Sequence, residues 1–256
     1  MIFGLEFPPI ENIVEWPSLG GDDSFFGFNK IALINVIALV GTAVLFMVGG
    51  RARSLVPRGA QNFVELSVDF IRGQVVAPTI GPHGGDKYLP LLTTLFFFIF
   101  IGNIFEVIPF FNMPSNARMA NPAIMALYVW VFFIAVGFKH QGVGSYFKAN
   151  LFPPGVPKAL YVLVTPIEFI STFLVRPFSL AVRLFANMLA GHILLVTFSV
   201  LCITLWTLKP LLLALPFSFF MLVALTAFEV MVSFLQAYIF TILAAVYIGG
   251  AMHPDH

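Results

Sequence analysis

The sequence has few charged side chains. Of its 256 residues, 10% are Asp, Glu, Lys or Arg, and the mean hydropathy is +0.97, whereas a soluble domain usually carries about 25% charged residues. The formal net charge is only +1, which gives no sign of a nucleic-acid partner or of strong electrostatic steering. The single cysteine, Cys202, excludes a disulfide bond within the chain. This composition predicts an integral membrane protein.

Several motifs are also missing. A phosphate-binding loop of the GxxxxGK[ST] type does not occur, so nucleotide chemistry is not expected on this chain. No internal repeat and no linker to a soluble domain are visible. Residues 1–30 hold five acids and one lysine, without the basic and apolar regions of a secretory signal and with too many acids for a transit peptide. We expect no catalytic residues, no cofactor and no bound metal.

The first stretch without charge, residues 31–50, has the length of one membrane span. Its twenty residues match the number that crosses about 30 Å of hydrocarbon as a helix. Arg51, Arg53 and Arg58 follow it, whereas residues 1–30 are net negative. Because cytoplasmic loops collect Lys and Arg, segment 1–30 is predicted to lie outside and Arg51 inside.

Two further elements precede the C-terminal region. Residues 59–78 repeat apolar side chains at a spacing of three or four, which predicts an amphipathic helix on the cytoplasmic surface. Residues 88–138 form two apolar runs around a short polar loop, which predicts a helical hairpin. Its first run, Tyr88–Phe111, is expected to be one span with Glu106 as its only charge. A loop rich in lysine follows and is predicted to be cytoplasmic.

Residues 159–252 contain two unusually long apolar segments. Pro177–Leu208 has 32 residues and Phe217–Gly250 has 34, without an internal proline, and these lengths correspond to about 48 and 51 Å of helix. A hydrocarbon core of about 30 Å would require a tilt of about 50°, above the usual range of about 0–40°. The segments are therefore predicted to form a strongly tilted hairpin joined around Lys209–Pro210, or to be broken.

Together these elements define the predicted fold. The chain is expected to be an all-α integral membrane protein with a single membrane domain, residues 1–256. It should have about five to six membrane helices, including the long C-terminal hairpin, and one amphipathic surface helix.

Five ionisable side chains fall in or around the apolar segments: Glu106, Glu168, Arg183, His192 and Glu229. A charge at the centre of a bilayer costs roughly 2.5–3.5 kcal/mol, and such groups usually mark an ion pathway. Arg183 stays protonated, so it suits the role of a fixed positive charge better than that of a proton carrier. The alternative is a static salt bridge with Glu168 or Glu229.

Helical spacing divides the polar residues between faces. Asn187 lies one turn after Arg183 and shares its face, whereas His192, nine residues on, lies about 180° around the helix. Glu229 and Gln236 are seven residues apart and share a face of the next helix. A histidine and a carboxylate on adjacent helices could relay protons near neutral pH, although a lone buried histidine is often only a core residue.

Arg176 and the small residues have simpler interpretations. Arg176 precedes Pro177 near the start of the long segment, where an arginine can extend to the lipid headgroups. The glycines and alanines of residues 187–191 and 243–250 are typical of close helix packing.

Three segments, in order, resemble one family of membrane proteins. Residues 176–192, RPFSLAVRLFANMLAGH, closely resemble the signature helix of the F-type ATP synthase a subunit. Residues 228–240 resemble the last helix of that family, and residues 103–109, NIFEVIP, resemble an earlier channel segment. The resemblance covers nearly the whole chain, is closest to bacterial members, and rests on a specific RLFANM core.

The resemblance implies roles for individual residues. Arg183 matches the arginine that faces a ring of c subunits in that family. Asn187 and Gln236 match polar residues beside it. His192 and Glu229 match an interacting pair in the half-channel open to the outside.

The other two acids match the same proton path by resemblance. Glu106 matches an acid of the outer half-channel, and Glu168 matches the acid of the cytoplasmic half-channel. Glu168 lies fifteen residues before Arg183, one more than in many members of the family. A kink at Pro177 would absorb this additional residue.

The function implied by the resemblance is that of a proton-conducting stator subunit. Two offset half-channels would couple proton flow to rotation of the c ring and so to ATP synthesis on other subunits. The expected partners are the c ring, the b subunits of the peripheral stalk, the rest of the F-type ATP synthase, membrane lipid and protons, with no nucleic acid. The expected location is the bacterial plasma membrane, with the mitochondrial inner membrane as the alternative.

Two other functions compete with this interpretation. A secondary transporter could bind an anionic substrate at Arg183, but no repeated halves are found in the sequence. A purely structural scaffold would leave the energetic cost of five intramembrane ionisable groups unexplained.

Overall fold

The computed structural model describes residues 29–51, 58–81, 84–108, 111–152, 157, 160–207 and 209–252. Within these ranges the chain forms helices and connecting turns, without a β-strand, which confirms the all-α prediction. The α-helices are α2 (Lys30–Arg51), α3 (Ala60–Ile71), α4 (Ala77–Thr79), α5 (Leu89–Ile104), α6 (Ala120–Gln141), α7 (Val143–Leu151), α8 (Tyr161–Ile170), α9 (Arg176–Thr207) and α10 (Leu215–Met252). The expected external segment lies, apart from Asn29 and Lys30, outside the described residues.

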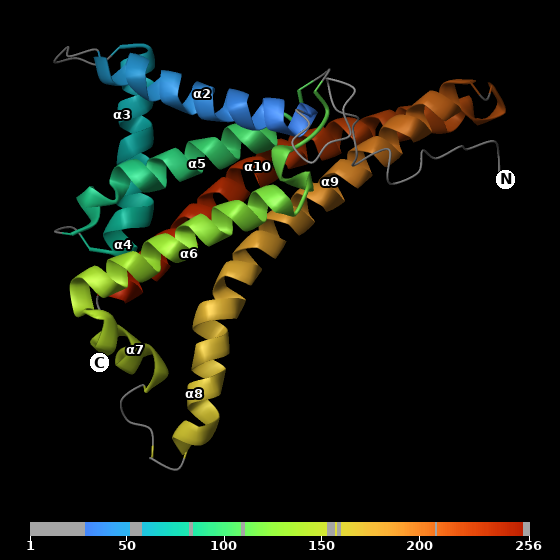
Figure 1. The fold of residues 1–256 in the computed structure, drawn as a ribbon. Helices are drawn as coiled ribbons and strands as arrows, with labels where there is room; N and C mark the ends of the chain where they lie inside the picture. The colour runs from blue at the N-terminus through green and yellow to red at the C-terminus, as the bar shows by residue number, and fades with distance from the viewer. Residues whose placement is uncertain are drawn as a thin grey trace.

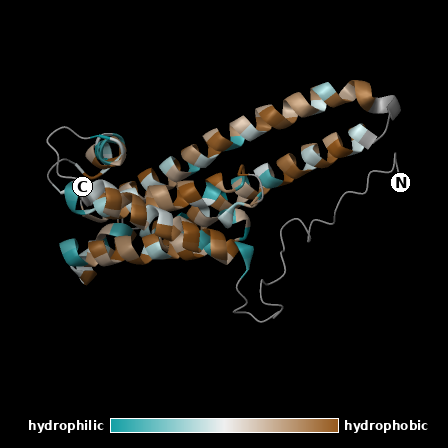
Figure 2. Ribbon diagram, turned by 90° about the horizontal axis from the view of Figure 1, so that it is seen from above, coloured by the Kyte–Doolittle hydropathy of each residue, from teal (hydrophilic) through white to brown (hydrophobic). Residues whose placement is uncertain are grey.

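Four stretches are long and apolar enough to cross a membrane, and α5 is a shorter apolar helix. The four are Lys30–Gly50, Ala120–Gln141, Tyr161–Trp206 and Leu212–Met252. With α5 they make five, in agreement with the five to six that the sequence predicts. Hydrophobic residues run along these helices, and hydrophilic residues gather mainly at helix ends and connections (Figure 2). The chain is therefore a multi-pass membrane protein.

Helix α10 is the centre of the bundle and packs against α5, α6 and α9 (Figure 1). Its buried residues near the C-terminal end are small, as at Ala244, Ala245 and Gly249. At Gly249 the carbonyl oxygen of Thr79 comes so close that a β-carbon would collide with it. The small residues of this segment thus permit close packing between backbones, as predicted.

Helix α3 is amphipathic. It packs against α2 and α5, yet three of its apolar side chains, Phe63, Leu66 and Phe70, remain exposed on the isolated chain. The exposed residue Arg72 follows directly and forms ion pairs with Asp69 and Asp86 at 3.3 and 3.1 Å. An apolar face beside a charged end fits a helix that lies on the membrane surface.

The two long C-terminal segments are continuous helices and are not broken. Helix α9 has 32 residues and α10 has 38, or about 48 and 57 Å at 1.5 Å per residue. A 3₁₀ segment, η6 (Lys209–Ala214), joins them into a hairpin. Pro177 and Pro216 lie in the first turn of each helix, where a missing backbone N–H costs little.

The chain enters α9 through a segment of π-helix rather than through a kink at Pro177. This segment, η5 (Ser171–Val175), includes a hydrogen bond from the backbone N–H of Arg176 to the carbonyl oxygen of Ser171. Helices α8 and α9 run in different directions on its two sides (Figure 1). The expectation of a kink at Pro177 was therefore wrong in position.

Helix α5 is shorter than the predicted span Tyr88–Phe111. It ends at Ile104, and the backbone N–H groups of Glu106 and Val107 bond three residues back, to Asn103 and Ile104. Helices usually end before the residue that precedes a proline, and Pro109 follows shortly after. Glu106 consequently lies in a turn and not within the helix.

Helix α7 is an element that the sequence pattern did not indicate. Gly142, with φ of 79°, ends α6 and starts α7 directly. The ring of Tyr146 on α7 then lies against Gly137 of α6, where a β-carbon would collide with it. The glycine at each position lets the chain fold back closely on itself.

Candidate functional site

Arg183 lies on an exposed face of α9. Asn187, Ala190 and Leu194 continue this face along the helix and are also exposed, as their spacing predicts. Among the described residues no ion pair joins Arg183 to Glu168 or Glu229, so the structure does not support the static salt bridge. The guanidinium of Arg183 is open to a partner outside the chain.

His192 lies on the opposite face of α9 and is 5% exposed. Its Nδ1 atom is 3.9 Å from Oε1 of Glu106, which is 1% exposed. This contact becomes an ion pair when the imidazole is protonated. The turn that ends α5 thus brings Glu106 to the buried side of α9, next to the histidine.

Glu229 of α10 is the third ionisable group of this cluster and is 3% exposed. Its carboxylate lies against Gly191, directly before His192, where a β-carbon would collide with both carboxylate oxygens. Glu229 is also close enough to Glu106 for their charges to repel each other. Gly191 is therefore more than a helix-packing residue, because its missing side chain provides the space that Glu229 occupies.

A cavity of about 150 Å³ adjoins this cluster. Glu106, His192, Asn112, Ser199 and Thr226 provide its polar lining. Both carboxylate oxygens of Glu106 are buried without a hydrogen-bond partner among the described residues. Since buried polar atoms are normally hydrogen-bonded and a water molecule occupies about 30 Å³, the cavity has the size and the polar atoms to hold several waters.

A chain of asparagines supports the turn that carries Glu106. The side-chain amide of Asn116 donates to Oδ1 of Asn103 at 2.6 Å, and that of Asn121 donates to Asn116 at 2.8 Å. Asn121 also contacts Oδ1 of Asn35 on α2 at 3.2 Å. The backbone carbonyl of Asn103 accepts the N–H of Glu106 at 3.0 Å. The sequence analysis did not identify this chain, although repeated asparagines around an apolar segment were a signal for it.

Glu168 is separate from the buried cluster. It is partly buried on α8, three residues before the π-helical segment η5. A π-turn accommodates one residue more than an α-turn. The fifteen-residue spacing between Glu168 and Arg183 therefore keeps the register that fourteen residues would give in a regular α-helix.

Gln236 is buried in the bundle and does not share the exposed face of Arg183. It is 4% exposed and lies two turns after Glu229 on α10, on the same side of the helix. The structure thus places Gln236 with the buried residues of α10, and Asn187 with Arg183 at the surface.

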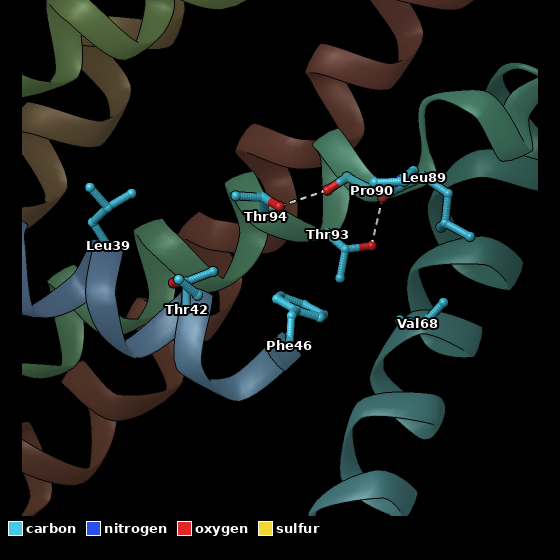
Figure 3. Close-up of a pocket in the computed structure, with 9 residues that line it drawn as sticks. Leu39, Thr42, Phe46, Val68, Leu89, Pro90, Thr93 and Thr94 are labelled. Carbon is cyan, nitrogen blue, oxygen red and sulfur yellow. Dashed lines mark hydrogen bonds between the residues drawn. The ribbon is translucent and has the colours of Figure 1, made fainter. Parts of the chain in front are cut away.

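A larger cavity, of about 490 Å³, lies between α2, α3 and α5 (Figure 3). Its lining is apolar apart from threonines, and none of its lining residues is ionisable. The hydroxyls of Thr42, Thr93 and Thr94 donate to carbonyl oxygens four residues back in their own helices, each at 2.7 Å. These hydroxyls are already satisfied, so this cavity offers no group for proton transfer.

Comparison with known proteins agrees with the arrangement of these residues. A profile of the ATP synthase A chain family matches residues 31–249. ATP synthase subunit a of Rhodococcus erythropolis is 42% identical over 90% of this chain and 84% of its own length. The Frankia alni protein of the same name is 41% identical over 94% of the chain and 83% of its own length. Subunit a of Streptomyces lividans is 40% identical over 99% and 90%.

The profile match includes all the residues of the buried cluster and the exposed arginine. The relatives are bacterial, which agrees with the predicted location in a bacterial plasma membrane. The chain belongs to the ATP synthase A chain family and is a subunit a of the proton channel of an F-type ATP synthase.

Proposed function

We propose that this chain conducts protons through two offset half-channels, and that Arg183 faces a ring of c subunits between them. The observation that carries the proposal is the division of α9 into two faces. Arg183 is exposed, whereas His192, on the opposite face, is buried beside Glu106 and a polar cavity. One face suits a moving partner and the other suits an enclosed proton path.

The outer half-channel consists of the 150 Å³ cavity and the three ionisable side chains beside it. A proton entering through water in the cavity reaches Glu106 first, because this carboxylate lines the cavity. His192 accepts it across the 3.9 Å contact, with a small movement or one water molecule completing the hydrogen bond. Glu229, packed against Gly191, then offers the next acceptor on α10.

Arg183 acts as a fixed charge that separates the half-channels. A c-subunit carboxylate that has lost its proton is attracted to the guanidinium, whereas a protonated, neutral one can turn toward lipid. Arginine keeps its own proton, so it cannot pass protons directly from one side to the other. Ala186 and Ala190 lie beside Arg183 on the exposed face, and their small side chains allow a ring helix to approach closely.

Glu168 belongs to the cytoplasmic half-channel in this proposal. Its support is the π-helical segment, which restores the register between Glu168 and Arg183 that the family pattern requires. The b subunits of the peripheral stalk hold the chain against the ring as the stator. Each proton that crosses 100 mV supplies about 2.3 kcal/mol, so several protons drive the synthesis of each ATP.

The hairpin of α9 and α10 lies at a strong inclination to the membrane normal. Its helices, about 48 and 57 Å long, exceed the hydrocarbon thickness of about 30 Å. An inclined α9 passes along the side of the ring and separates the two half-channels laterally. Electron cryomicroscopy of the assembled complex in lipid nanodiscs measures the angle, and helices within about 30° of the normal would contradict this part of the proposal.

Cysteine labelling tests the division of α9 directly. Cys202 is the only cysteine, so replacing it by serine gives a simple background for single cysteines. In assembled ATP synthase, Asn187→Cys should form disulfides with cysteines introduced in c-subunit outer helices. Ser199→Cys, which lines the cavity, should react with a membrane-impermeant methanethiosulfonate reagent added from outside.

Ser218→Cys is the matched control for the accessibility measurement. Ser218 is 2% exposed on the same hairpin and does not line the 150 Å³ cavity, so its cysteine should stay unlabelled. The proposal fails if Ser199→Cys is as unreactive as this control, or if Asn187→Cys never forms a disulfide with the c ring.

A further inference from the structure

A second polar cavity, of about 170 Å³, lies at the end of the bundle opposite the tip of the long hairpin. Arg176 at the start of α9, Tyr247 near the end of α10, and Tyr146 and Asn150 of α7 provide its polar lining. It shares no lining residue with the 150 Å³ cavity beside His192. The proton path proposed above does not use it.

Arg176 does not simply extend to the lipid headgroups as the sequence suggested. Its guanidinium lies over the ring of Tyr247, 5.4 Å from the centroid, and the side chain is partly buried. Within the described part of the chain, no carboxylate forms an ion pair with it. Stacking covers one face of the guanidinium and leaves its in-plane N–H groups, which match the oxygens of a phosphate.

Tyr146 provides a second donor at the same cavity. The residue is 1% exposed, and no hydrogen bond of its hydroxyl is found among the described residues. The Arg176 charge is close enough to lower the pKa of this hydroxyl, against the larger opposite effect of burial, which raises it. A buried hydroxyl without a partner normally has one, and here it lies beside an unpaired cation.

Asn150 contributes one further N–H group. Its side-chain amide donates one hydrogen to the carbonyl oxygen of Tyr146 at 2.9 Å, and the same nitrogen carries a second hydrogen. Its Oδ1 atom is an acceptor, so the favourable contacts with an anion come from the nitrogen. The cavity therefore combines a cation with neutral donors from a second helix.

The surroundings of this cavity favour an anionic, membrane-bound ligand. From Met119 to Trp206 the sequence has five lysines and arginines but one acid, Glu168. Val175 and Val246, next to Arg176 and Tyr247 in the chain, are 49% and 45% exposed and apolar. Basic pockets between transmembrane helices on the cytoplasmic side are typical sites for anionic lipid headgroups.

We propose that this cavity binds the phosphate group of an anionic phospholipid, with the guanidinium of Arg176 and the hydroxyl of Tyr146 as its donors. The lipid chains lie along the exposed apolar side chains beside the pocket. The bound phosphate neutralises Arg176 and links α7, α9 and α10 at one point. Free inorganic phosphate has the same binding chemistry and is the competing source of the anion.

Lipid retention by the assembled ATP synthase tests this proposal. Complexes are purified from membranes containing phosphatidylglycerol and phosphatidylcholine, washed extensively with detergent, and their bound phospholipid is counted by native mass spectrometry. Wild type should retain a phosphatidylglycerol that Arg176→Ala loses by about tenfold or more, since charge-assisted bonds to phosphate contribute on that scale. Tyr146→Phe, which keeps the ring contacts, should give a smaller loss.

Lys148→Ala is the matched control, because Lys148 is an exposed base on α7 that does not line the cavity. It should retain the lipid as wild type does. Equal retention in Arg176→Ala and wild type overturns the proposal. If Arg176→Ala complexes do not assemble, equal retention in Tyr146→Phe overturns the donor assignment instead.

A phosphate titration separates the two sources of the anion. Lipid-stripped wild-type and Arg176→Ala complexes are titrated with radiolabelled inorganic phosphate, and the difference between them reports this site rather than nucleotide sites elsewhere in the complex. A difference without lipid retention supports the anion site and overturns the lipid as its occupant. No difference in either measurement overturns both.

Discussion

The two faces of α9 handle charge in opposite ways. Arg183 carries a charge that does not titrate, and it is exposed on the isolated chain. His192 and its neighbours Glu106 and Glu229 can each gain or lose a proton, and all three are buried. Since α9 is a continuous helix, these two environments are held at a fixed separation of nine residues, or about 13.5 Å along its axis.

This contrast shows why one helix can serve two purposes. An exposed fixed charge can attract a partner without offering a route for protons, whereas an enclosed titratable cluster can pass protons without meeting the partner. The following predictions test the contrast in order of decreasing expected effect.

The largest effect is expected from removing the fixed charge. In Arg183→Ala, ATP-driven proton pumping and ATP synthesis should fall to background while the complex still assembles, because no other group supplies the charge on that face. Arg183→Lys should also fail, since an ammonium does not reproduce the planar guanidinium. Acridine-dye quenching in inverted membrane vesicles measures the pumping, and normal coupled pumping in Arg183→Ala would reject the assignment.

The buried cluster should act as a unit. His192→Ala and Glu229→Ala should each reduce passive proton flux, and their combination should depart from additivity by roughly 0.5–3 kcal/mol when flux is expressed as free energy. Exchanging the two residues, His192→Glu with Glu229→His, should preserve more flux than either exchange alone. Pairing His192→Ala with the distant, exposed change Asn62→Ala serves as the additive control.

A smaller effect is expected from filling the space next to Glu229. In Gly191→Ala the new methyl group meets the Glu229 carboxylate, and crowding of this kind costs about 1–3 kcal/mol. Proton flux should fall, and the shorter side chain of Glu229→Asp should restore part of it. Gly50→Ala is the matched control, because a β-carbon there has no neighbour within 4 Å; equal flux in both alanine variants would contradict the contact.

The smallest effect is expected from the asparagine chain. Asn116→Ala removes the 2.6 Å hydrogen bond to Asn103, and a buried polar group without a partner costs about 1–3 kcal/mol. The thermal midpoint of the purified complex should fall, and proton flux should fall less than in the Glu229 variants. Asn62→Ala on the exposed side of α3 should change neither; an unchanged midpoint in Asn116→Ala would mean that the chain does not support the turn.

Much of the fold could be predicted because long apolar segments have few alternatives in a membrane. The two long C-terminal helices and the exposed and buried faces of α9 followed from segment length and helical spacing alone. The end of α5 could not be predicted in the same way, since it depends on hydrogen bonds to Asn103 and on Asn116, thirteen residues further along the chain. Helix α7 depends on the contact between Tyr146 and Gly137, which a pattern of hydropathy does not contain.

The candidate site was predictable in its members but not in its contacts. Sequence spacing suggested Glu229 as the partner of His192, whereas the structure adds Glu106 at 3.9 Å as a close neighbour. The space for Glu229 comes from Gly191, a residue whose effect lies in the side chain it lacks. Arg176 was interpreted as reaching for the membrane surface, but its stacking on Tyr247 requires knowledge of how α9 and α10 meet.

The π-helical segment Ser171–Val175 makes the length of this region adjustable during evolution. A lineage that loses one residue there can close the wide turn into a regular α-turn, so that neither Glu168 nor Arg183 rotates away from its surroundings. A deletion elsewhere between these residues has no such reserve and turns one end of the helix by about 100° relative to the other. Insertions and deletions among related proteins should therefore concentrate at this turn, and a protein engineer could remove Leu174 with less damage than a residue of α9 closer to Arg183.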